Sequence, residues 1–529
     1  MPARRTASML TLLLATGLFR FPGAARAQAA SPSPRPQPTA CRPLPAPSAG
    51  PGSGPGPVAY DVRLEPDLGT GELRERARVA IRNPGLADSI ELRLNDWFDS
   101  VSVTAAGARA RVRRGPGSVV VRLAPARARE TLCFELAGRP GQSGDERRSV
   151  LGRESLFLLW SDAFYPLDYY AWAPVRLTVA LPRGFRVFGP GHEVSDSGGV
   201  HTFVSEHPLR LFSVLADRRW IETRRTIGGL RLRTLLYPAE QPYADSLLAR
   251  SADVLSAYAR LFGPYAFDEF TFATLDSLYA RRALAGGVVY SPAYLAREMA
   301  RTGYDGHETA LLWWGYTTTG RGPGAFQWTE GLGDYAEYLY DEERHRPLPE
   351  NWRRFRAAYL ALPAGSEPPL TALRGSTPQA IVHGKYPWLL HLLRFDLGDD
   401  AFRRALRDLF VRYRFRAFTL DEMVQSLAAS AGRPLAWWRD DWLLRPAVPE
   451  VSFAATVEPD GHRWRIVARL EQATPPFTFP AEIGAFSGAT TALHRVRVDR
   501  ASQTFVLPAA TRPDSVVLDP RGWVLMRRR

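Results

Sequence analysis

The chain has 529 residues, a formal charge of +14 at pH 7 and apolar residues at 45% of its positions. This length is too great for one hydrophobic core and indicates roughly three structural units. The positive charge does not indicate a nucleic-acid partner, because arginines are spread along the chain among acids, as in RRALRDLFVRYRFR, and Lys385 is the only lysine. Such a bias is typical of genome composition and of a solvated surface.

Residues 1–27 have the pattern of a secretory signal peptide, with a basic start, an apolar run from Met9 to Phe19 and a cleavage site after Ala27. A transmembrane anchor needs about 18 or more apolar residues, and Arg20 ends this run too early. No later stretch is long enough to span a bilayer. We therefore expect a bacterial protein exported to the periplasm or the outside of the cell, without a transmembrane segment.

Residues 28–57 consist mainly of Pro, Gly, Ser and Ala, which predicts a linker. Residues 58–219 contain short alternating runs such as YDVRLEPD and RARVAIRNP, bounded by turn residues, and predict an antiparallel β domain. Cys41 lies in the linker and Cys133 in the strand-like segment ETLCFEL. In an oxidising compartment the two could form one disulfide, and the sequence leaves this open.

Residues 220–448 change to helical spacing, as in YADSLLARSADVLSAYARLFG, and predict a mostly helical domain. Thr419, followed three residues later by Glu422, is typical of a capping box that begins a helix. Residues 449–529 return to alternation, with a hairpin expected at Asp460 and Gly461, and predict a small β-sandwich. The predicted fold class is therefore multidomain α+β.

The segment GYDGHETALLWWG, residues 303–315, begins like the metal-binding helix of a zinc protease. Residues four apart share one face of a helix, which is why such helices carry two histidines in an H-E-x-x-H pattern. His307 and Glu308 match the pattern, but Leu311 stands at the position of the second histidine and has no lone pair to offer. Taken alone, the segment predicts an ordinary packed helix.

Eighteen residues separate Leu311 from Glu330, which lies in FQWTEGLGDYAEYLY. Together with Trp314 and Gly315, this spacing resembles the aminopeptidase N-like family of zinc metallopeptidases, the gluzincins. LAGGVVYSP is similar to the family's G-G-M-E-Y substrate motif, and VHGKYPWLLHLL to its Y-x-K-G segment. The resemblance covers the mature chain in domain order. It implies an N-terminal antiparallel β domain, a mostly helical thermolysin-like domain and a C-terminal β-sandwich.

The resemblance implies zinc ligands at His307 and Glu330, with Glu308 at the position of the general base that acts on zinc-bound water. A catalytic zinc normally has three protein ligands and a water molecule. Because Leu311 replaces the third ligand, the resemblance also implies that the ordinary zinc site is damaged.

Two further motif positions differ from the family. Gly286 and Gly287 match the substrate motif, but Val289 stands where a glutamate would hold the amino group of the substrate. His383 stands where a tyrosine would donate a hydrogen bond to the oxyanion of the tetrahedral intermediate, whereas Lys385 keeps its motif position. We therefore expect that the ordinary aminopeptidase reaction is lost.

Two interpretations of function stay open. In the first, the chain is a catalytically inactive member of the family that holds no cofactor and binds a peptide or protein ligand in its cleft. In the second, His383 substitutes as a ligand, so that zinc is held by two histidines and one carboxylate, a set that occurs in catalytic zinc sites. His391, surrounded by apolar residues in WLLHLLR, is expected to be a buried helix residue rather than a ligand. The sequence does not indicate an oligomeric state.

Overall fold

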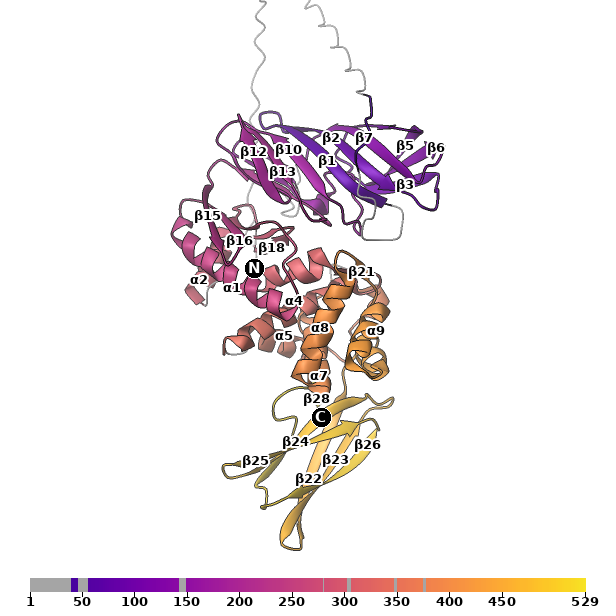
Figure 1. Ribbon diagram of the computed structural model, residues 1–529. Helices are drawn as coiled ribbons and strands as arrows, with labels where there is room; N and C mark the ends of the chain where they lie inside the picture. Colours follow the sequence, from indigo (N-terminus) through magenta and orange to yellow (C-terminus); the bar gives the residue numbers. More distant parts are fainter. Residues whose placement is uncertain are drawn as a thin grey trace, which may run out of the picture. The chain divides into compact units, whose positions relative to one another are not determined.

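The computed structural model describes residues 40–45, 56–141, 149–278, 280–301, 306–346, 350–373 and 377–529. The expected signal peptide and most of the expected linker lie outside these residues. The contacts of the chain separate Met1–Ala40 from a second unit, Cys41–Arg529, which holds the helices and strands of the described residues (Figure 1).

The first part of this second unit is built from strands. A seven-stranded sheet has the order β12-β13-β10-β1-β2-β7-β4, a four-stranded sheet the order β11-β14-β9-β8, and a three-stranded sheet the order β3-β6-β5. Their bounds are β1 Gly56–Asp67, β2 Glu72–Arg82, β3 Ser89–Arg93, β4 Ser100–Ala105, β5 Arg109–Gly115, β6 Ser118–Ala124, β7 Arg129–Gly138, β8 Val150–Leu151, β9 Ser155–Leu158, β10 Val175–Ala180, β11 Arg186–Phe188, β12 His192–Ser197, β13 Val200–Val204 and β14 Val214–Asp217. The neighbouring pairs are antiparallel as expected, except that β1 and β10 run parallel.

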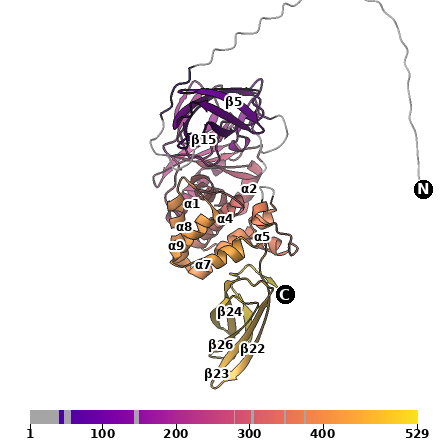
Figure 2. The ribbon, with the colours of Figure 1, turned by 90° about the vertical axis from the view of Figure 1, so that its right-hand side faces the viewer.

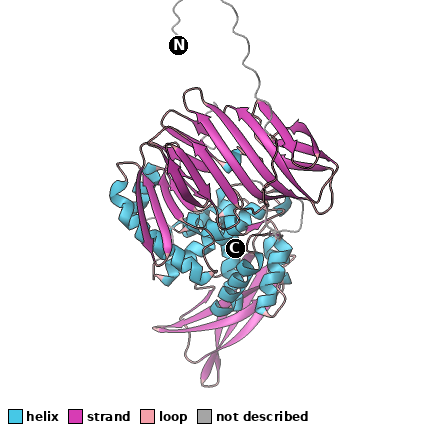
Figure 3. Cartoon of the chain, turned by 45° about the horizontal axis from the view of Figure 1, so that its top comes forward, coloured by secondary structure: helices cyan, strands magenta, loops and turns pink. Residues whose placement is uncertain are grey.

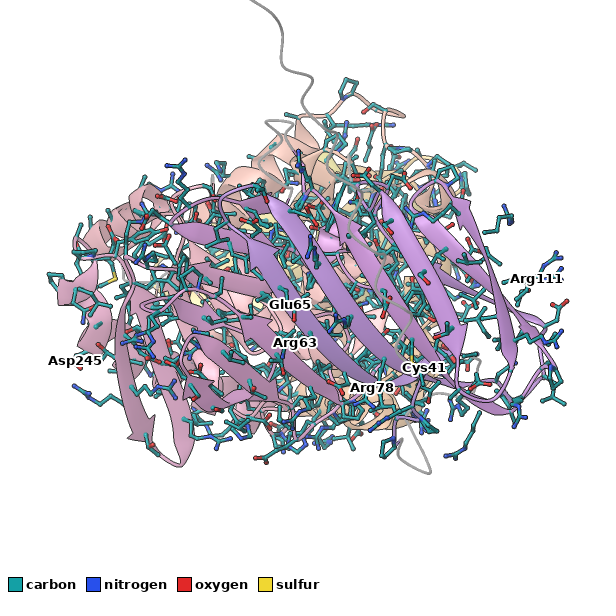
Figure 4. The ribbon with its side chains drawn as sticks, turned by 90° about the horizontal axis from the view of Figure 1, so that it is seen from above. Cys41, Arg63, Glu65, Arg78, Arg111 and Asp245 are labelled. Atoms are coloured by element: carbon teal, nitrogen blue, oxygen red, sulfur yellow. A yellow bond between two sulfur atoms is a disulfide. The ribbon has the colours of Figure 1, made fainter. Side chains whose placement is uncertain are left out.

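Alternation along these strands separates a buried face from a charged one. In β2 the side chains of Leu73, Ala77 and Val79 are buried, while Arg74 and Arg76 are exposed and Arg78 is half-buried. Figure 4 labels Arg63, Glu65 and Arg78 on the seven-stranded sheet, where Arg63 forms an ion pair with Glu65 at 2.7 Å and Arg78 forms one with Asp61. The charges of this face are thus paired with one another, which fits the expected solvated surface. A disulfide joins Cys41 to Cys133 of β7, with the Cα atoms 5.6 Å apart.

The sequence interpretation did not include the five-stranded sheet that follows, in the order β15-β16-β17-β19-β18. Its strands are β15 Ile221–Ile227, β16 Leu230–Leu236, β17 Phe270–Thr274, β18 Arg281–Leu284 and β19 Gly287–Tyr290. Every residue of β17 and β19 is buried, so neither strand alternates. A short buried run of this kind cannot be told from a buried helix segment by its periodicity.

Helices dominate the remainder of the central region (Figure 3). They are α1 Ala244–Leu261, α2 Pro292–Arg301, α3 His307–Leu311, α4 Ala325–Glu343, α5 Glu350–Leu360, α6 Gln379–Val382, α7 Tyr386–Leu397, α8 Asp399–Tyr413 and α9 Leu420–Ala431. Helix α4 contacts α1, α3, α6 and α7 (Figure 2). The expected capping box is confirmed at α9, where the hydroxyl of Thr419 accepts a hydrogen bond from the backbone N–H of Glu422.

The last part of the chain forms two sheets, β26-β23-β22-β28 and β25-β24-β27. The strands are β22 Glu450–Asp460, β23 Arg463–Gln472, β24 Phe479–Ser487, β25 Thr490–Val498, β26 Ser502–Ala509, β27 Ser515–Leu518 and β28 Arg527–Arg528, with β20 Thr319–Gly320 pairing β21 Ala417–Phe418 in the central region. The expected hairpin is confirmed, because Asp460 pairs with Arg463 at its end. The mixed, multidomain fold class is therefore confirmed, while the domain boundaries stay predictions.

Among the described residues, no helix combines the length and the apolar character that crossing a membrane would require.

Candidate functional site

Helix α3 carries His307 and Glu308, and both side chains are buried. The helix begins after Gly306, whose carbonyl accepts a hydrogen bond from the Tyr258 hydroxyl of α1 at 3.0 Å. A Cβ atom at Gly306 would lie 2.4 Å from that hydroxyl, so only glycine allows α3 to start this close to α1. This contact fixes the position of His307 at the first residue of α3.

Helix α4 presents its carboxylates to His307. Nε2 of His307 lies 3.3 Å from Oε2 of Glu330, and Nδ1 lies 2.9 Å from Oδ1 of Asp334. Asp334 follows Glu330 by four residues, so the two share one face of the helix. Both nitrogens of the imidazole ring therefore meet a carboxylate.

His383, which follows α6, is brought to the same place. Its Nδ1 lies 2.7 Å from Oδ2 of Asp334, and the ring centroids of His307 and His383 are 5.9 Å apart. Asp334 thus lies between two imidazole rings, with one oxygen toward each. The sequence analysis did not identify Asp334, and the only available signal was its spacing of four residues from Glu330.

Burial and the neighbouring charges set the protonation of this cluster. Burial alone would lower the pKa of His307, but Asp334, Glu330 and Glu308 raise it well above its ordinary value. Burial would raise the pKa of Asp334, yet His383 and His307 hold it well below its usual range. Burial raises the pKa of Glu337, which also lies on α4, to about 7.

Glu308, the expected general base, is bound to an arginine that the sequence analysis missed. Nε of Arg281 lies 3.2 Å from Oε1 of Glu308, and the two side chains are only 15% and 10% exposed. Arg281 lies on the edge strand β18, and its guanidinium is 5.2 Å from the centre of the Tyr294 ring. Although burial opposes its charge, Tyr290, Glu308 and other neighbours raise the pKa of Arg281 above its ordinary value. The two side chains therefore form a largely buried ion pair.

Leu311 leaves α3 on the same side as His307. A Cβ atom built on Gly333 of α4 would lie 2.8 Å from Cδ2 of Leu311 and 3.7 Å from Cε1 of His307. Residue 311 therefore faces the carboxylate-bearing helix, as the H-E-x-x-H spacing predicts, but brings an apolar side chain there.

The residues of the expected substrate motif lie around the turn between β18 and β19. Gly286 has a φ of +85°, and Gly287 approaches the backbone of β17 so closely that a Cβ atom would lie 2.1 Å from the Thr271 carbonyl oxygen. Val289 is 1% exposed and belongs to an apolar cluster with Phe188, Leu215, Trp220 and Leu235, among others. From this hairpin, it is Arg281 that contacts Glu308.

Lys385 is also buried rather than directed to solvent. Its ammonium group donates hydrogen bonds to Oε1 of Glu367 at 2.6 Å and to the carbonyl of Arg445 at 2.8 Å. Burial lowers the pKa of Lys385, and Glu367 counteracts that effect.

The residues present fit the family's zinc only in part. His307 Nε2 and Glu330 Oε2 are 3.3 Å apart, roughly the separation of two neighbouring ligands of a tetrahedral zinc with bonds of about 2.0–2.1 Å. Leu311 supplies no third donor. Another set, His307, Asp334 and Glu337, has possible ligand atoms within 4.8 Å of one another. Both oxygens of Asp334 already meet imidazole rings, however, and Glu337 interacts with the charge of Arg281. The family's zinc site is therefore not complete in this chain.

Comparison with known proteins points to aminopeptidases. No protein-family model matches the chain. Aminopeptidase N of Lactococcus lactis subsp. lactis is 33% identical over 73 residues, which are 14% of this chain and 9% of that protein. Aminopeptidase N of Lactobacillus helveticus is 34% identical over 83 residues, which are 16% of this chain and 10% of that protein.

The fold is similar to that of a Legionella pneumophila aminopeptidase A, whose crystal structure was determined in complex with aspartic acid. The TM-score is 0.73 at 14% sequence identity, over 90% of this chain and 59% of that chain. The chain thus has an aminopeptidase-like fold and a partial sequence similarity to aminopeptidase N, and it spans less than two thirds of each of these relatives.

Proposed function

We propose that the chain is an exported, aminopeptidase N-like protein whose zinc site has degenerated and that binds peptides or protein segments without hydrolysing them. The observation that carries the proposal is the ion pair between Arg281 and Glu308, in a site where Leu311 supplies no metal ligand. Signal-peptide cleavage after Ala27 and the role of the expected site residues are part of the proposal.

The ion pair opposes the hydrolytic role of Glu308. In the family this carboxylate accepts a proton from zinc-bound water. Here one of its oxygens is committed to Arg281 in a largely buried position. Breaking a buried pair by removing one partner typically costs about 3–5 kcal/mol, because a charge is left without its partner. The Glu308 carboxylate therefore has a structural role, as the partner of Arg281.

The charge of the site does not replace the missing ligand. Four carboxyl groups face the site, from Glu308 of α3 and from Glu330, Asp334 and Glu337 of α4, and they outnumber the positive groups Arg281 and His307. This charge would attract a cation, but a catalytic zinc is normally held by three protein ligands, and Leu311 supplies none.

Replacement of the oxyanion donor lowers the expected reaction rate independently of the loss of zinc. Removing one such donor typically lowers the rate about 10²-fold to 10³-fold. His383 stands at that position and its Nδ1 is bonded to Asp334. What remains is the fold of a peptide-handling protein, and clefts at domain interfaces are common binding sites.

Elemental analysis tests the loss of zinc. Protein purified without a His tag is incubated with excess zinc, freed of unbound metal and compared with the His307→Ala variant. We expect well below one zinc per chain in both proteins, and no chelator-sensitive hydrolysis of aminoacyl p-nitroanilides. One zinc per chain that His307→Ala removes, together with chelator-sensitive hydrolysis, would overturn the proposal.

Peptide binding is measured separately, by calorimetry with a mixed pool of unstructured peptides. Heat of binding that saturates, without cleavage of the peptides, supports the proposed function. Absence of binding leaves no support for a peptide-binding role.

One observation favours a second candidate function, zinc-dependent hydrolysis with His383 as a substitute ligand. Asp334 accepts a hydrogen bond from Nδ1 of His383 and lies 2.9 Å from Nδ1 of His307, and such a carboxylate fixes a metal-binding histidine so that Nε2 is left to the metal. If the second candidate is correct, His383→Ala loses both zinc and hydrolysis, whereas under our proposal the wild type has neither to lose.

A further inference from the structure

A cavity of about 690 Å³ is lined by residues of helix α5 and by the last residues of the chain, none of them from the cluster around His307. Its volume is in the range of pockets that hold small molecules, about 300–1,000 Å³. The lining combines charged and apolar side chains from three segments: Arg356, Leu360, Asp519, Pro520, Arg521, Met526, Arg527 and Arg528.

Three of the four arginines lack an acidic partner. Within the part of the chain that the structure describes, Arg356, Arg527 and Arg528 form no ion pair. Arg356 lies over the Trp388 ring at 4.9 Å and donates to the Val524 carbonyl at 3.4 Å. Arg528 donates to the Leu518 carbonyl at 2.7 Å. Neither contact neutralises a positive charge.

The two other charged residues of the lining are already engaged. Arg521 is bound to Glu482, with its Nε 2.7 Å from Oε2. The carboxylate of Asp519 accepts hydrogen bonds from the backbone N–H groups of Trp523 and Val524, at 2.8 and 3.0 Å. Asp519 is 4% exposed, and its buried carboxylate interacts with the charges of Arg356 and Arg528. The cavity carries an excess of positive charge.

This excess is costly in the protein alone. Burial lowers the pKa of Arg356, and the charge of Arg528 lowers it further, against the opposite effect of Asp519. An anion placed between Arg356 and Arg528 would remove this repulsion. Arginine suits phosphate in particular, because its planar guanidinium donates two parallel hydrogen bonds to phosphate oxygens.

We propose that this cavity binds a small organic phosphate monoester, with the phosphate held by Arg356 and Arg528. The apolar part of the cavity contacts the organic group that the phosphate carries. Leu360, Pro520 and Met526 supply a non-polar wall that inorganic phosphate alone would not contact. The site is independent of the peptidase-like cluster, because no lining residue belongs to it.

Calorimetry on the full chain at low salt tests the site, with phenyl phosphate, inorganic phosphate and benzoate as probes. We expect phenyl phosphate to bind more tightly than inorganic phosphate, since its ring contacts the apolar wall, and benzoate to bind most weakly, since it carries one charge. Arg528→Ala and Arg356→Ala should each weaken phenyl phosphate binding about 10-fold, as expected for loss of a charge-assisted contact.

Arg529 offers a matched control. It is the next residue after Arg528, is exposed, does not line the cavity and forms an ion pair with Glu450 at 2.8 Å. Arg529→Ala should leave binding unchanged, as should His307→Ala. The proposal is overturned if the wild type shows no saturable binding of phenyl phosphate, or if Arg529→Ala weakens it as much as Arg528→Ala.

Discussion

Leu311 determines how His307 is used, because the two side chains leave α3 on the same side and both face Gly333 of α4. With an apolar residue at 311, the imidazole of His307 has carboxylates as its nearest polar neighbours, and these raise its pKa well above the ordinary value. The same ring in a metal site would have to be neutral to act as a ligand. Under the proposed function, Leu311 is therefore the residue that keeps zinc from this cluster.

Leu311→His should therefore restore zinc binding in part. The new imidazole would lie on the face that already holds His307 and near Glu330, which completes the three-ligand set. We expect zinc content to rise from well below one to nearly one ion per chain, measured by elemental analysis after incubation with zinc. Since Arg281 still binds Glu308, we expect little gain in hydrolysis.

The double variant Leu311→His with His307→Ala is the control for this experiment. It should lose the gained zinc, because two protein ligands from the motif remain. Equal zinc in the single and double variants would show that the metal binds elsewhere.

At the residue scale, motif spacing was sufficient to predict that His307, Glu308 and Glu330 belong to one region. It could not indicate Arg281, because that residue reaches Glu308 only through the pairing of β18 with β19. Asp334 was not predicted for a related reason. The sequence does not show that two other segments bring histidines to this helix carboxylate. Tertiary contacts of this kind leave no local pattern.

Helix α7 buries the imidazole of His391, which makes protonation of this ring unfavourable in the folded protein. His391 lies 6% exposed in this helix, its Nδ1 is 3.2 Å from the Tyr335 hydroxyl, and its ring is stacked on Trp523 at 4.3 Å. Burial, with the nearby charges of Arg394 and Arg356, lowers the pKa of His391 to about 3. The expectation of a buried helix histidine is confirmed.

The low pKa predicts a loss of stability in acid. In the unfolded chain His391 takes up a proton near pH 6.5, whereas in the folded chain it does so only near pH 3. The unfolded state therefore binds more protons between these values, and the free energy of unfolding falls as the pH decreases from about 6.5 toward 3. Between pH 7 and pH 5 this single group should account for about 2 kcal/mol.

Urea unfolding at pH 7 and pH 5 measures this effect, by comparing the wild type with His391→Gln. The variant should lose about 2 kcal/mol less than the wild type over that range. His462, which is exposed in the turn between β22 and β23, serves as control through His462→Gln. An identical pH dependence of the wild type and His391→Gln would contradict the prediction.

At the element scale, the sequence predicted those features that have a local chemical signature. The capping box of α9 and the β22–β23 hairpin follow from a few neighbouring residues. The sheet of β15 to β19 has no such signature, because its inner strands are short and buried on both faces. The parallel pairing of β1 with β10 could not be predicted either, because the register and direction of a strand pair depend on how distant segments meet.

At the scale of the whole molecule, the disulfide connects Cys41 to β7 across 92 residues of sequence. A cross-link over such a separation stabilises a protein mainly by restricting its unfolded chain, typically by about 2–4 kcal/mol. It also agrees with the proposed export, because disulfides persist in oxidising compartments.

Replacing both cysteines with serine should therefore lower the free energy of unfolding by about 2–4 kcal/mol, measured by urea denaturation at neutral pH. The same loss is expected when the wild type is unfolded in the presence of a reductant, whereas the double variant should not respond to reductant. Equal stability of the oxidised wild type and the Cys41→Ser, Cys133→Ser variant would contradict the prediction.

The burial of Lys385 has a practical consequence for handling the protein. It is the only lysine of the chain, its side chain is 1% exposed, and its ammonium group is held by Glu367 and the Arg445 carbonyl. A lysine-specific protease has a single bond to cut, and that bond is reached only when the segment joining α6 and α7 opens. The rate of cleavage between residues 385 and 386 thus measures how often this segment opens. Amine-directed labels find no accessible lysine side chain on the folded protein.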